Sequence, residues 1–165
     1  RIHATVPFFQ MSERDRFANA RSFGLRLIAY RPRSEAEVKE RISRRFDSAL
    51  AHQVVESLRQ AALLDDSKFA RRWAESRLDH NPRSASAIRW EIAARGVEAS
   101  VAADAVRDVD DEESAYRAAS KHAGRLSKVD LPTFRRRLWA YLSRRGYPSS
   151  VARSTIDRIW NETRG

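Results

Sequence analysis

The sequence contains no cysteine and no long apolar run, and it has only five glycines and five prolines. Without cysteine, a disulfide framework and a thiolate zinc site are both excluded, and a reducing cytoplasm is the expected location. No apolar stretch approaches the ~20 residues that a membrane-spanning helix needs, so we expect no role within a membrane. Runs of β-branched residues, which are typical of strands, are also scarce. The composition therefore favours a soluble protein made of helices.

Positive charge is in excess and is unevenly distributed. The 28 arginines and 4 lysines outnumber the 22 acidic residues, which gives a net charge of +10. Residues 96–113 carry one basic and seven acidic side chains, and they separate two basic regions. A basic surface of this kind suits phosphate backbones or an acidic protein partner. The alternative is a solvated arginine-rich surface that binds nothing.

Apolar residues recur at helical spacing along almost the whole chain, which predicts an all-α protein. The first helix should run from about Asp15 to Tyr30 and stop before Pro32, which disfavours a helical residue ahead of it. Ser34 and Glu37 have the spacing of a capping box, so a second helix should begin at Ser34. A third helix follows, and its apolar face carries Leu50, Val54, Val55, Leu58 and Ala61.

The second half of the chain predicts six more helices. Asp65 and Asp66 can cap the fourth, whose inward face carries Phe69, Ala70, Trp73, Ala74 and Leu78. A fifth should run from Ser84 to Arg95 and end at Gly96 in the left-handed conformation. The others are expected at about residues 101–109, 112–126, 131–145 and 148–160.

Two segments, YRPRSEAEVKERISRRF from Tyr30 and HNPRSASAIRWEIAARG from His80, resemble each other at an offset of 50 positions. A further shift of 50 pairs nine positions with residues of similar type, Gly96 with Gly146 among them, although Phe46 replaces this glycine in the first copy. We therefore predict three tandem three-helix repeats of helix-turn-helix-like form, at residues 15–64, 65–110 and 111–165. Residues 1–14 form an N-terminal extension of unpredicted structure. Each repeat is too small to bury its apolar faces alone, so the repeats should stack into an elongated curved body.

Few residues could form a catalytic or metal site. The four histidines lack the spacing of metal ligands, and the sequence has no glycine-rich phosphate loop and no serine-histidine-aspartate arrangement. The pair Asp65-Asp66 and the acidic run from Asp110 to Glu113 could each bind a metal, but helix capping explains both. We expect a binding protein without catalysis, metal or cofactor.

Arginines at turns and helix ends are the better functional candidates, since a planar guanidinium pairs with phosphate and with carboxylate. Arg31, Arg33 and Arg83 precede helix N-termini, where positive charge is unfavourable, so we expect them to face outward and bind. Arg144 and Arg145 have the alternative role of complementing the dipole at a helix C-terminus. The candidate partner- or DNA-binding residues are Arg31, Arg33, Arg83, Arg89, Arg135, Arg136, Arg144 and Arg145.

Aromatic residues could stack on bases, but most of them lie in or beside apolar stripes, which favours packing in the core. Trp90 and Trp139 are the ambiguous members, because each adjoins a core position without clearly sharing its face. The full set is Trp73, Trp90, Trp139, Trp160, Tyr30, Tyr116, Tyr141 and Tyr147.

Four segments give the chain a resemblance to the RecX family of bacterial regulators of the RecA recombinase. They are YRPRSEAEV from Tyr30, LLDDSKFARRWAESR from Leu63, PRSASAIRWEIAARGV from Pro82 and YLSRRGYPSSV from Tyr141. The resemblance covers about residues 15–160 and implies tandem three-helix repeats. It departs from the family pattern at Phe46, and Asn81 stands where the first repeat has Arg31, so the first two corners should differ in their contacts.

The resemblance also implies a function. Members of this family bind along the groove of the RecA-DNA filament and limit its growth, strand exchange and the coprotease activity that triggers the SOS response; some also bind single- or double-stranded DNA. We therefore expect a cytoplasmic monomer whose partner is the RecA filament. The alternative is a stand-alone DNA-binding protein built from helix-turn-helix-like units, and a metal-dependent nuclease is a more distant one.

Overall fold

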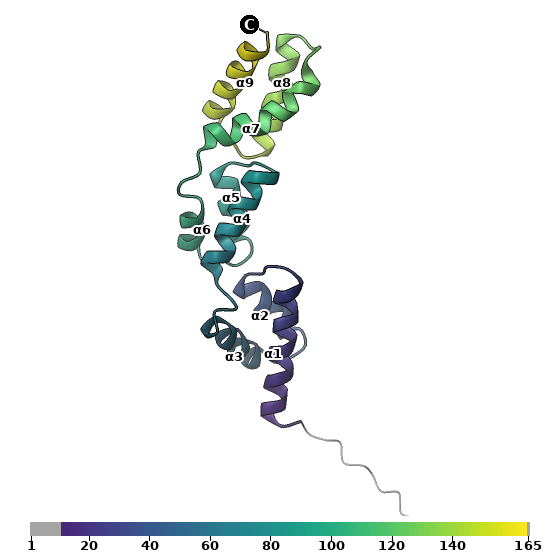
Figure 1. Cartoon of the computed structure of the whole chain (residues 1–165), viewed down its shortest axis with the longest axis vertical. Coiled ribbons are helices and arrows are strands. Elements are labelled where there is room, and N and C mark those ends of the chain that lie inside the picture. The colour runs from purple at the N-terminus through teal and green to yellow at the C-terminus, as the bar shows by residue number, and fades with distance from the viewer. Residues whose placement is uncertain (1–10, 165) are drawn as a thin grey trace, which may run out of the picture. The chain divides into compact units, whose positions relative to one another are not determined.

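The computed structural model describes residues 11–164, with side chains described for 11–163, so the predictions for residues 1–10 lie outside the described residues. The described chain contains nine α-helices, one 3-10 helix and no strand (Figure 1). The prediction of an all-α fold is confirmed. The helices are α1 (Glu13–Tyr30), α2 (Glu35–Ser43), α3 (Ser48–Gln60), α4 (Asp66–His80), α5 (Ala85–Ala93), α6 (Ala99–Ala105), α7 (Asp111–Ala123), η1 (Gly124–Leu126), α8 (Leu131–Arg144) and α9 (Ser149–Arg164).

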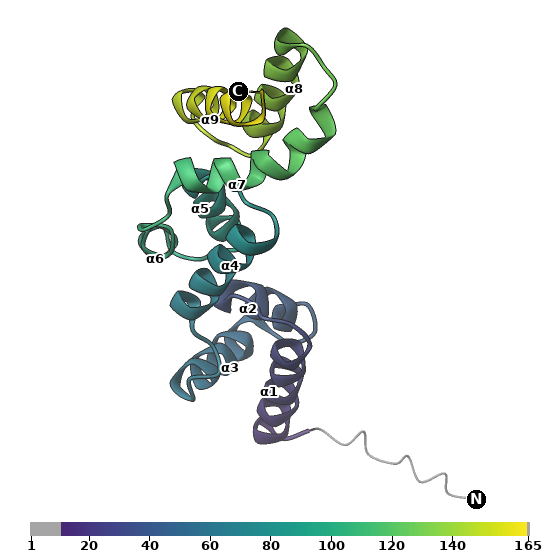
Figure 2. The ribbon, with the colours of Figure 1, turned by 45° about the horizontal axis from the view of Figure 1, so that its top comes forward.

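The helices group in threes, and each group has its own apolar core. We call them repeat 1 (α1–α3), repeat 2 (α4–α6) and repeat 3 (α7–α9), and Figure 2 shows the three helices of each lying together. Repeat 1 belongs to a compact unit that ends at Asp65, and repeats 2 and 3 together make a second compact unit, Asp66–Gly165. The buried cores are centred on Val38, Ile42, Val54 and Leu58 in repeat 1, on Ala70, Ile88, Ile92 and Ala102 in repeat 2, and on Ala119, Leu138, Leu142 and Ala152 in repeat 3.

Polar caps set where most helices begin. Ser34 accepts from the backbone N–H of Glu37 while Glu37 accepts from that of Ser34, so the predicted capping box is present. Ser84 caps α5 with a single hydrogen bond, in which its hydroxyl accepts from the backbone N–H of Ala87. Helix α1 begins at Glu13 because Ser12 supplies its cap. Each such cap contributes about 1 kcal/mol.

Two glycines end the middle helices of repeats 2 and 3. Gly96 has φ +77° and follows the end of α5 at Ala93, and Gly146 has φ +83° and follows the end of α8 at Arg144. Glycine adopts this left-handed conformation without the strain that a Cβ atom brings. The predicted equivalence of the two positions is confirmed.

The structure corrects three details of the predicted helices. Helix α6 spans Ala99–Ala105, so Val106 and Val109, expected on this helix, lie beyond its end. Ala61 is exposed at the end of α3 and does not belong to its apolar face. Helix α9 runs to Arg164, four residues further than predicted. Its last turn is stabilised by the Glu162 carboxylate, which accepts from Tyr116 at 2.7 Å and from Arg158 at 2.9 Å.

No helix within residues 11–164 has both the length and the apolar character required to span a membrane. In the same part of the chain, no group of three or more histidine, aspartate and glutamate side chains is placed to hold a metal ion. Asp110 instead caps α7 by accepting from the backbone N–H groups of Glu112 and Glu113.

Candidate binding surface

The first Pro-Arg-Ser corner, between α1 and α2, separates its two arginines. Arg31 is exposed and forms a surface ion pair with Glu37 at 3.1 Å. Arg33 is half-buried, and its Nε donates to the carbonyl of Leu27 in the last turn of α1 at 3.2 Å. Burial, followed by the charge of Arg31, lowers the pKa of the Arg33 guanidinium from its ordinary value. The prediction that both arginines face outward is therefore wrong for Arg33, which satisfies the C-terminus of the preceding helix.

The second corner, residues 81–84, directs Arg83 toward a buried carboxylate of its own repeat. Arg83 Nε lies 3.3 Å from Glu91, whose side chain is only 12% exposed. Glu91 also accepts from Trp73 Nε1 at 2.9 Å and from Arg77 Nε at 2.7 Å. The guanidinium of Arg95 lies over the ring of Trp73, 3.6 Å from the ring centre. Arg83 is thus held within repeat 2 and is not the free outward arginine that the sequence predicts.

The second corner also packs against the turn between α8 and α9. Arg145 Nη1 donates to the side-chain oxygen of Asn81 and, at 2.9 Å, to the carbonyl of Pro82. The Arg145 carbonyl in turn accepts from the backbone N–H of Ser84 at 3.1 Å. Asn81 is the position where repeat 1 has Arg31, and the contacts of the two residues differ: Arg31 pairs with Glu37 of its own repeat, whereas Asn81 accepts from Arg145 of repeat 3. Arg145, predicted as a binding residue, instead joins repeats 2 and 3.

Further hydrogen bonds complete the contact between the second corner and repeat 3, which we call the joint between repeats 2 and 3. The hydroxyls of Ser114 and Tyr147 lie 2.7 Å apart in a buried position, and Ser114 also donates to the Arg83 carbonyl at 3.2 Å. Asp111, at the start of α7, accepts from the backbone N–H of Ala85 at 2.7 Å. The polar backbone groups of the corner are therefore paired with repeat 3, as buried polar groups must be.

Tyr141 links Arg145 to a histidine of α7. Its ring stacks on the imidazole of His122, with centroids 4.2 Å apart, and the Arg145 guanidinium lies 4.4 Å from the Tyr141 ring centre. Burial, followed by the charges of Arg125, Arg144 and Arg145, lowers the pKa of His122 from its ordinary value. The imidazole is consequently neutral at physiological pH, and among residues 11–163 it belongs to no group of side chains placed to hold a metal ion.

Tyr147 gives the joint a dependence on alkaline pH. Burial raises the pKa of its phenol from the ordinary 10.0 to about 12, and the Ser114 hydrogen bond opposes the rise. Because the folded protein holds this proton more tightly, the stabilisation is complete below pH 10 and is lost as the pH rises toward 12. We expect the free energy of unfolding of the second compact unit to fall by about 2 kcal/mol over that interval. Urea titrations at several alkaline pH values, with Tyr147→Phe alongside, measure this loss, and an equal fall in both proteins would contradict it.

Arg89 and Arg144 are exposed, and within residues 11–163 neither forms a hydrogen bond or an ion pair. They lie on α5 and just inside the C-terminus of α8, in repeats 2 and 3 respectively. A guanidinium without an internal partner keeps its full capacity to bind phosphate or carboxylate. Both therefore remain candidates for contact with a partner, as does Arg136 of α8, which is also exposed and forms no ion pair within residues 11–163.

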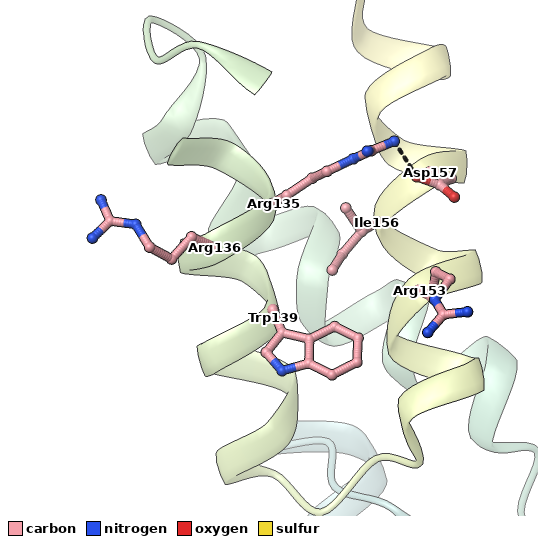
Figure 3. Close-up of a pocket in the computed structure, with 6 residues that line it drawn as sticks. All are labelled: Arg135, Arg136, Trp139, Arg153, Ile156 and Asp157. Atoms are coloured by element: carbon pink, nitrogen blue, oxygen red, sulfur yellow. Dashed lines mark hydrogen bonds and ion pairs between the residues drawn. The ribbon is translucent and has the colours of Figure 1, made fainter. Parts of the chain in front are cut away.

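Arg135 and Arg136 line a hollow between α8 and α9 of about 360 Å³ (Figure 3). We call it the α8–α9 groove, and its other lining residues are Trp139, Arg153, Ile156 and Asp157. Arg135 reaches across to α9 and pairs with Asp157 at 3.0 Å, while Arg136 points away from α9 into solvent.

Trp139 and Arg153 are the residues of this groove that the sequence analysis missed as site residues. The only sign of the groove in the sequence is the ambiguous position of Trp139 beside a core residue. In the structure, Trp139 is 38% exposed. Most other aromatic residues are buried or partly buried as predicted. Trp90 and Tyr30, at 73% and 84% exposed, are the clear exceptions, and Tyr30 is exposed because it is the last residue of α1.

A second hollow, of about 380 Å³, has the opposite charge and lies between α4, α6 and α7. Its carboxylates come largely from the acidic segment of the sequence, and two arginines accompany them. The charged residues lining it are Arg71, Glu75, Asp104, Asp108, Asp110, Glu113 and Arg117. The second compact unit thus presents an acidic hollow between repeats 2 and 3 and a basic groove on repeat 3.

Together, these features define an all-α protein of tandem three-helix repeats with an arginine-rich surface. Family models for the first, second and third three-helix domains of RecX match residues 20–58, 65–106 and 110–156. The regulatory protein RecX of Amycolatopsis mediterranei is 32% identical over 155 residues, covering 92% of this chain and 89% of the relative. That of Chlorobium phaeobacteroides is 31% identical over 137 residues, covering 82% and 90%. The chain belongs to the RecX family.

Solved structures agree with the fold. The crystal structure of RecX from Lactobacillus salivarius superposes with a TM-score of 0.77 at 17% identity, over 88% of this chain and 97% of that one. A second crystal structure of regulatory protein RecX gives a TM-score of 0.76 at 20% identity, over 92% and 82%. The prediction of three tandem three-helix repeats is confirmed, and so is the family that the sequence resembles.

Proposed function

We propose that this protein binds the RecA-DNA filament and limits filament growth, strand exchange and coprotease activity. The observation that carries the proposal is the match of three consecutive RecX domains. It is supported by relatives named regulatory protein RecX, which the chain matches over most of their length. The role is one of binding without catalysis, in the cytoplasm, where RecA acts.

The contacts of the arginines divide the predicted binding residues into three groups. Arg31 and Arg135 form surface ion pairs, and Arg136 is exposed without one, like Arg89 and Arg144. Arg33, Arg83 and Arg145 are engaged with carbonyls or carboxylates of the chain itself, so their substitution would disturb the fold as well as any interface. Arg89 and Arg144 have no such engagement and are exposed. Exposed charges at an interface mainly raise the association rate and fix the register of a complex. We assign Arg89 and Arg144 to contact with the filament.

A matched pair of double variants tests this assignment. Arg89→Gln with Arg144→Gln should raise the concentration needed for half-inhibition of RecA ATPase and strand exchange by about tenfold. Arg59→Gln with Arg107→Gln removes the same charge from exposed residues that are already paired with Glu56 and Asp104. This control should inhibit almost as well as the unsubstituted protein.

The unsubstituted protein also tests the function itself. Addition at a stoichiometric ratio to RecA filaments on single-stranded DNA, in low salt, should slow both reactions. No effect under these conditions would overturn the regulatory proposal. Equal loss of inhibition in the two double variants would keep the function but remove the assignment of Arg89 and Arg144.

The second candidate is a stand-alone DNA-binding protein, which the basic α8–α9 groove favours. It predicts binding to bare DNA with a steep salt dependence and no preference for RecA filaments. Pull-down with RecA filaments on single-stranded DNA, compared with the same DNA alone, separates the two functions.

A further inference from the structure

The α8–α9 groove combines an accessible indole with guanidinium groups. Trp139 neighbours Leu138 on α8, which is fully buried, but Trp139 itself is 38% exposed. The core beneath is already filled, since Phe134 packs against Trp160 with ring centres 5.1 Å apart and Ile156 is only 3% exposed. In Figure 3 the Trp139 ring lies in the space between the two helices, and none of the other residues that line the groove is aromatic. The indole is therefore available to a ligand.

The guanidinium groups around the indole are not neutralised by the chain. Three arginines and one carboxylate line the groove, and Asp157 is engaged by Arg135. Within residues 11–163, neither Arg136 nor Arg153 forms an ion pair or a hydrogen bond, and both are exposed. In Figure 3 the Arg153 side chain lies against α9 at one edge of the groove, and Arg136 projects outward from α8 at the other edge. The groove thus offers a flat aromatic face with unpaired positive charge beside it.

This combination fits a nucleotide better than other anionic ligands. Single-stranded nucleic acid presents alternating base faces and phosphates, and proteins bind it by stacking bases on aromatic rings within basic grooves. An acidic peptide would use the arginines but has no flat group for the indole. A volume of about 360 Å³ lies within the range of small-ligand sites.

We propose that the α8–α9 groove is a binding site for single-stranded nucleic acid, with a base stacked on Trp139 and neighbouring phosphates bound by Arg153 and Arg136. Stacking of this kind tolerates every base, so the site has little sequence preference. The phosphate contacts make its affinity fall with salt. The site stands on the groove alone and does not require the regulatory function proposed above.

The base-stacking part is tested with a fluorescein-labelled oligothymidylate and an abasic oligonucleotide of the same length, both without RecA. Trp139→Ala should weaken binding of the oligothymidylate by about tenfold, as expected for loss of one stacked base. The abasic strand keeps the phosphates and should bind both proteins equally. Trp139→Phe, which keeps an aromatic face and the fold, should retain most of the affinity. Trp90→Ala removes a more exposed tryptophan from α5 and serves as the control.

The proposed phosphate contacts are tested by single arginine-to-glutamine variants, each of which removes one positive charge inside or just outside the groove. Arg153→Gln and Arg136→Gln should weaken binding of both strands several-fold more than Arg137→Gln, since Arg137 is also exposed on α8 but does not line the groove. The two groove variants should also flatten the dependence of affinity on salt concentration.

Three outcomes would overturn the site. One is equal binding of oligothymidylate by the Trp139→Ala, Trp139→Phe and unsubstituted proteins. Another is an equal effect of Arg137→Gln and Arg153→Gln, which would indicate general attraction to the basic surface. The third is Trp139-dependent binding of a polyglutamate peptide with Trp139-independent binding of oligothymidylate, which would make the groove a protein-docking site. Since RecA is absent from these assays, their failure leaves the filament assays unaffected.

Discussion

Gly146→Ala is expected to lower the free energy of unfolding of the second compact unit by about 3 kcal/mol. Gly146 has φ +83°, and the left-handed conformation costs a residue with a side chain about 1–2 kcal/mol. A Cβ atom there would lie 2.8 Å from both the Ala87 Cβ and the Ser84 Oγ, too close for either neighbour to remain in place. Overpacking of this kind adds about 1–3 kcal/mol. Both neighbours belong to repeat 2, so the substitution acts on the joint between repeats 2 and 3.

Gly124→Ala is the matched control for this prediction. Gly124 has φ −55°, and a Cβ atom at this position meets no heavy atom within 4 Å. The substitution should leave stability unchanged or raise it by about 0.5 kcal/mol, because alanine restricts the unfolded chain. Urea unfolding followed by circular dichroism measures both variants, and similar midpoints for the two would show that the close approach at Gly146 is absent.

Glu91→Ala is expected to destabilise the same compact unit by about 2–3 kcal/mol. Its carboxylate accepts from Trp73 and Arg77 and pairs with Arg83, so its removal leaves two partly buried cations without their counterion. Loss of a hydrogen bond to a charged group is worth about 1.5–3 kcal/mol, and partial exposure of the two arginines limits the total.

Glu75→Ala provides the comparison, because Glu75 is exposed on α4 and forms no ion pair within the described residues. It should change stability by no more than about 0.5 kcal/mol. Glu91→Gln keeps an acceptor for Trp73 but removes the charge, so it should fall between the two alanine variants. If Glu91→Gln were as stable as the unsubstituted protein, the ion pairs would contribute nothing.

The apolar register of the repeats could be predicted from the sequence because it depends on helical periodicity, which is local. Two core positions of the middle helices recur every 50 residues, and all six side chains at these positions have no exposed surface: Val38, Ile88 and Leu138 at the first, and Ile42, Ile92 and Leu142 at the second. The capping box at Ser34 and the left-handed glycines are equally local, since they involve residues three or four positions apart.

The third corner shows where this local reasoning stops. The offset pairs Ser34 and Ser84 with Phe134, which is buried and cannot cap a helix. Helix α8 instead begins one turn earlier, where Asp130 accepts from the backbone N–H of Thr133. The apolar register is kept while the cap moves, because an added turn of helix leaves the buried face unchanged.

An all-α chain of three similar units could be predicted from the amino-acid sequence, because caps, helix-ending glycines and apolar spacing each act within a few residues. The sequence also showed which arginines lie at corners and helix ends. Only the tertiary structure decided what those arginines do. Arg145 donates to Asn81 and Pro82, which lie 64 and 63 positions away, whereas Arg153 on α9 and Trp139 on α8 line one groove. Such pairings depend on how distant helices pack, and no local pattern of residues encodes them.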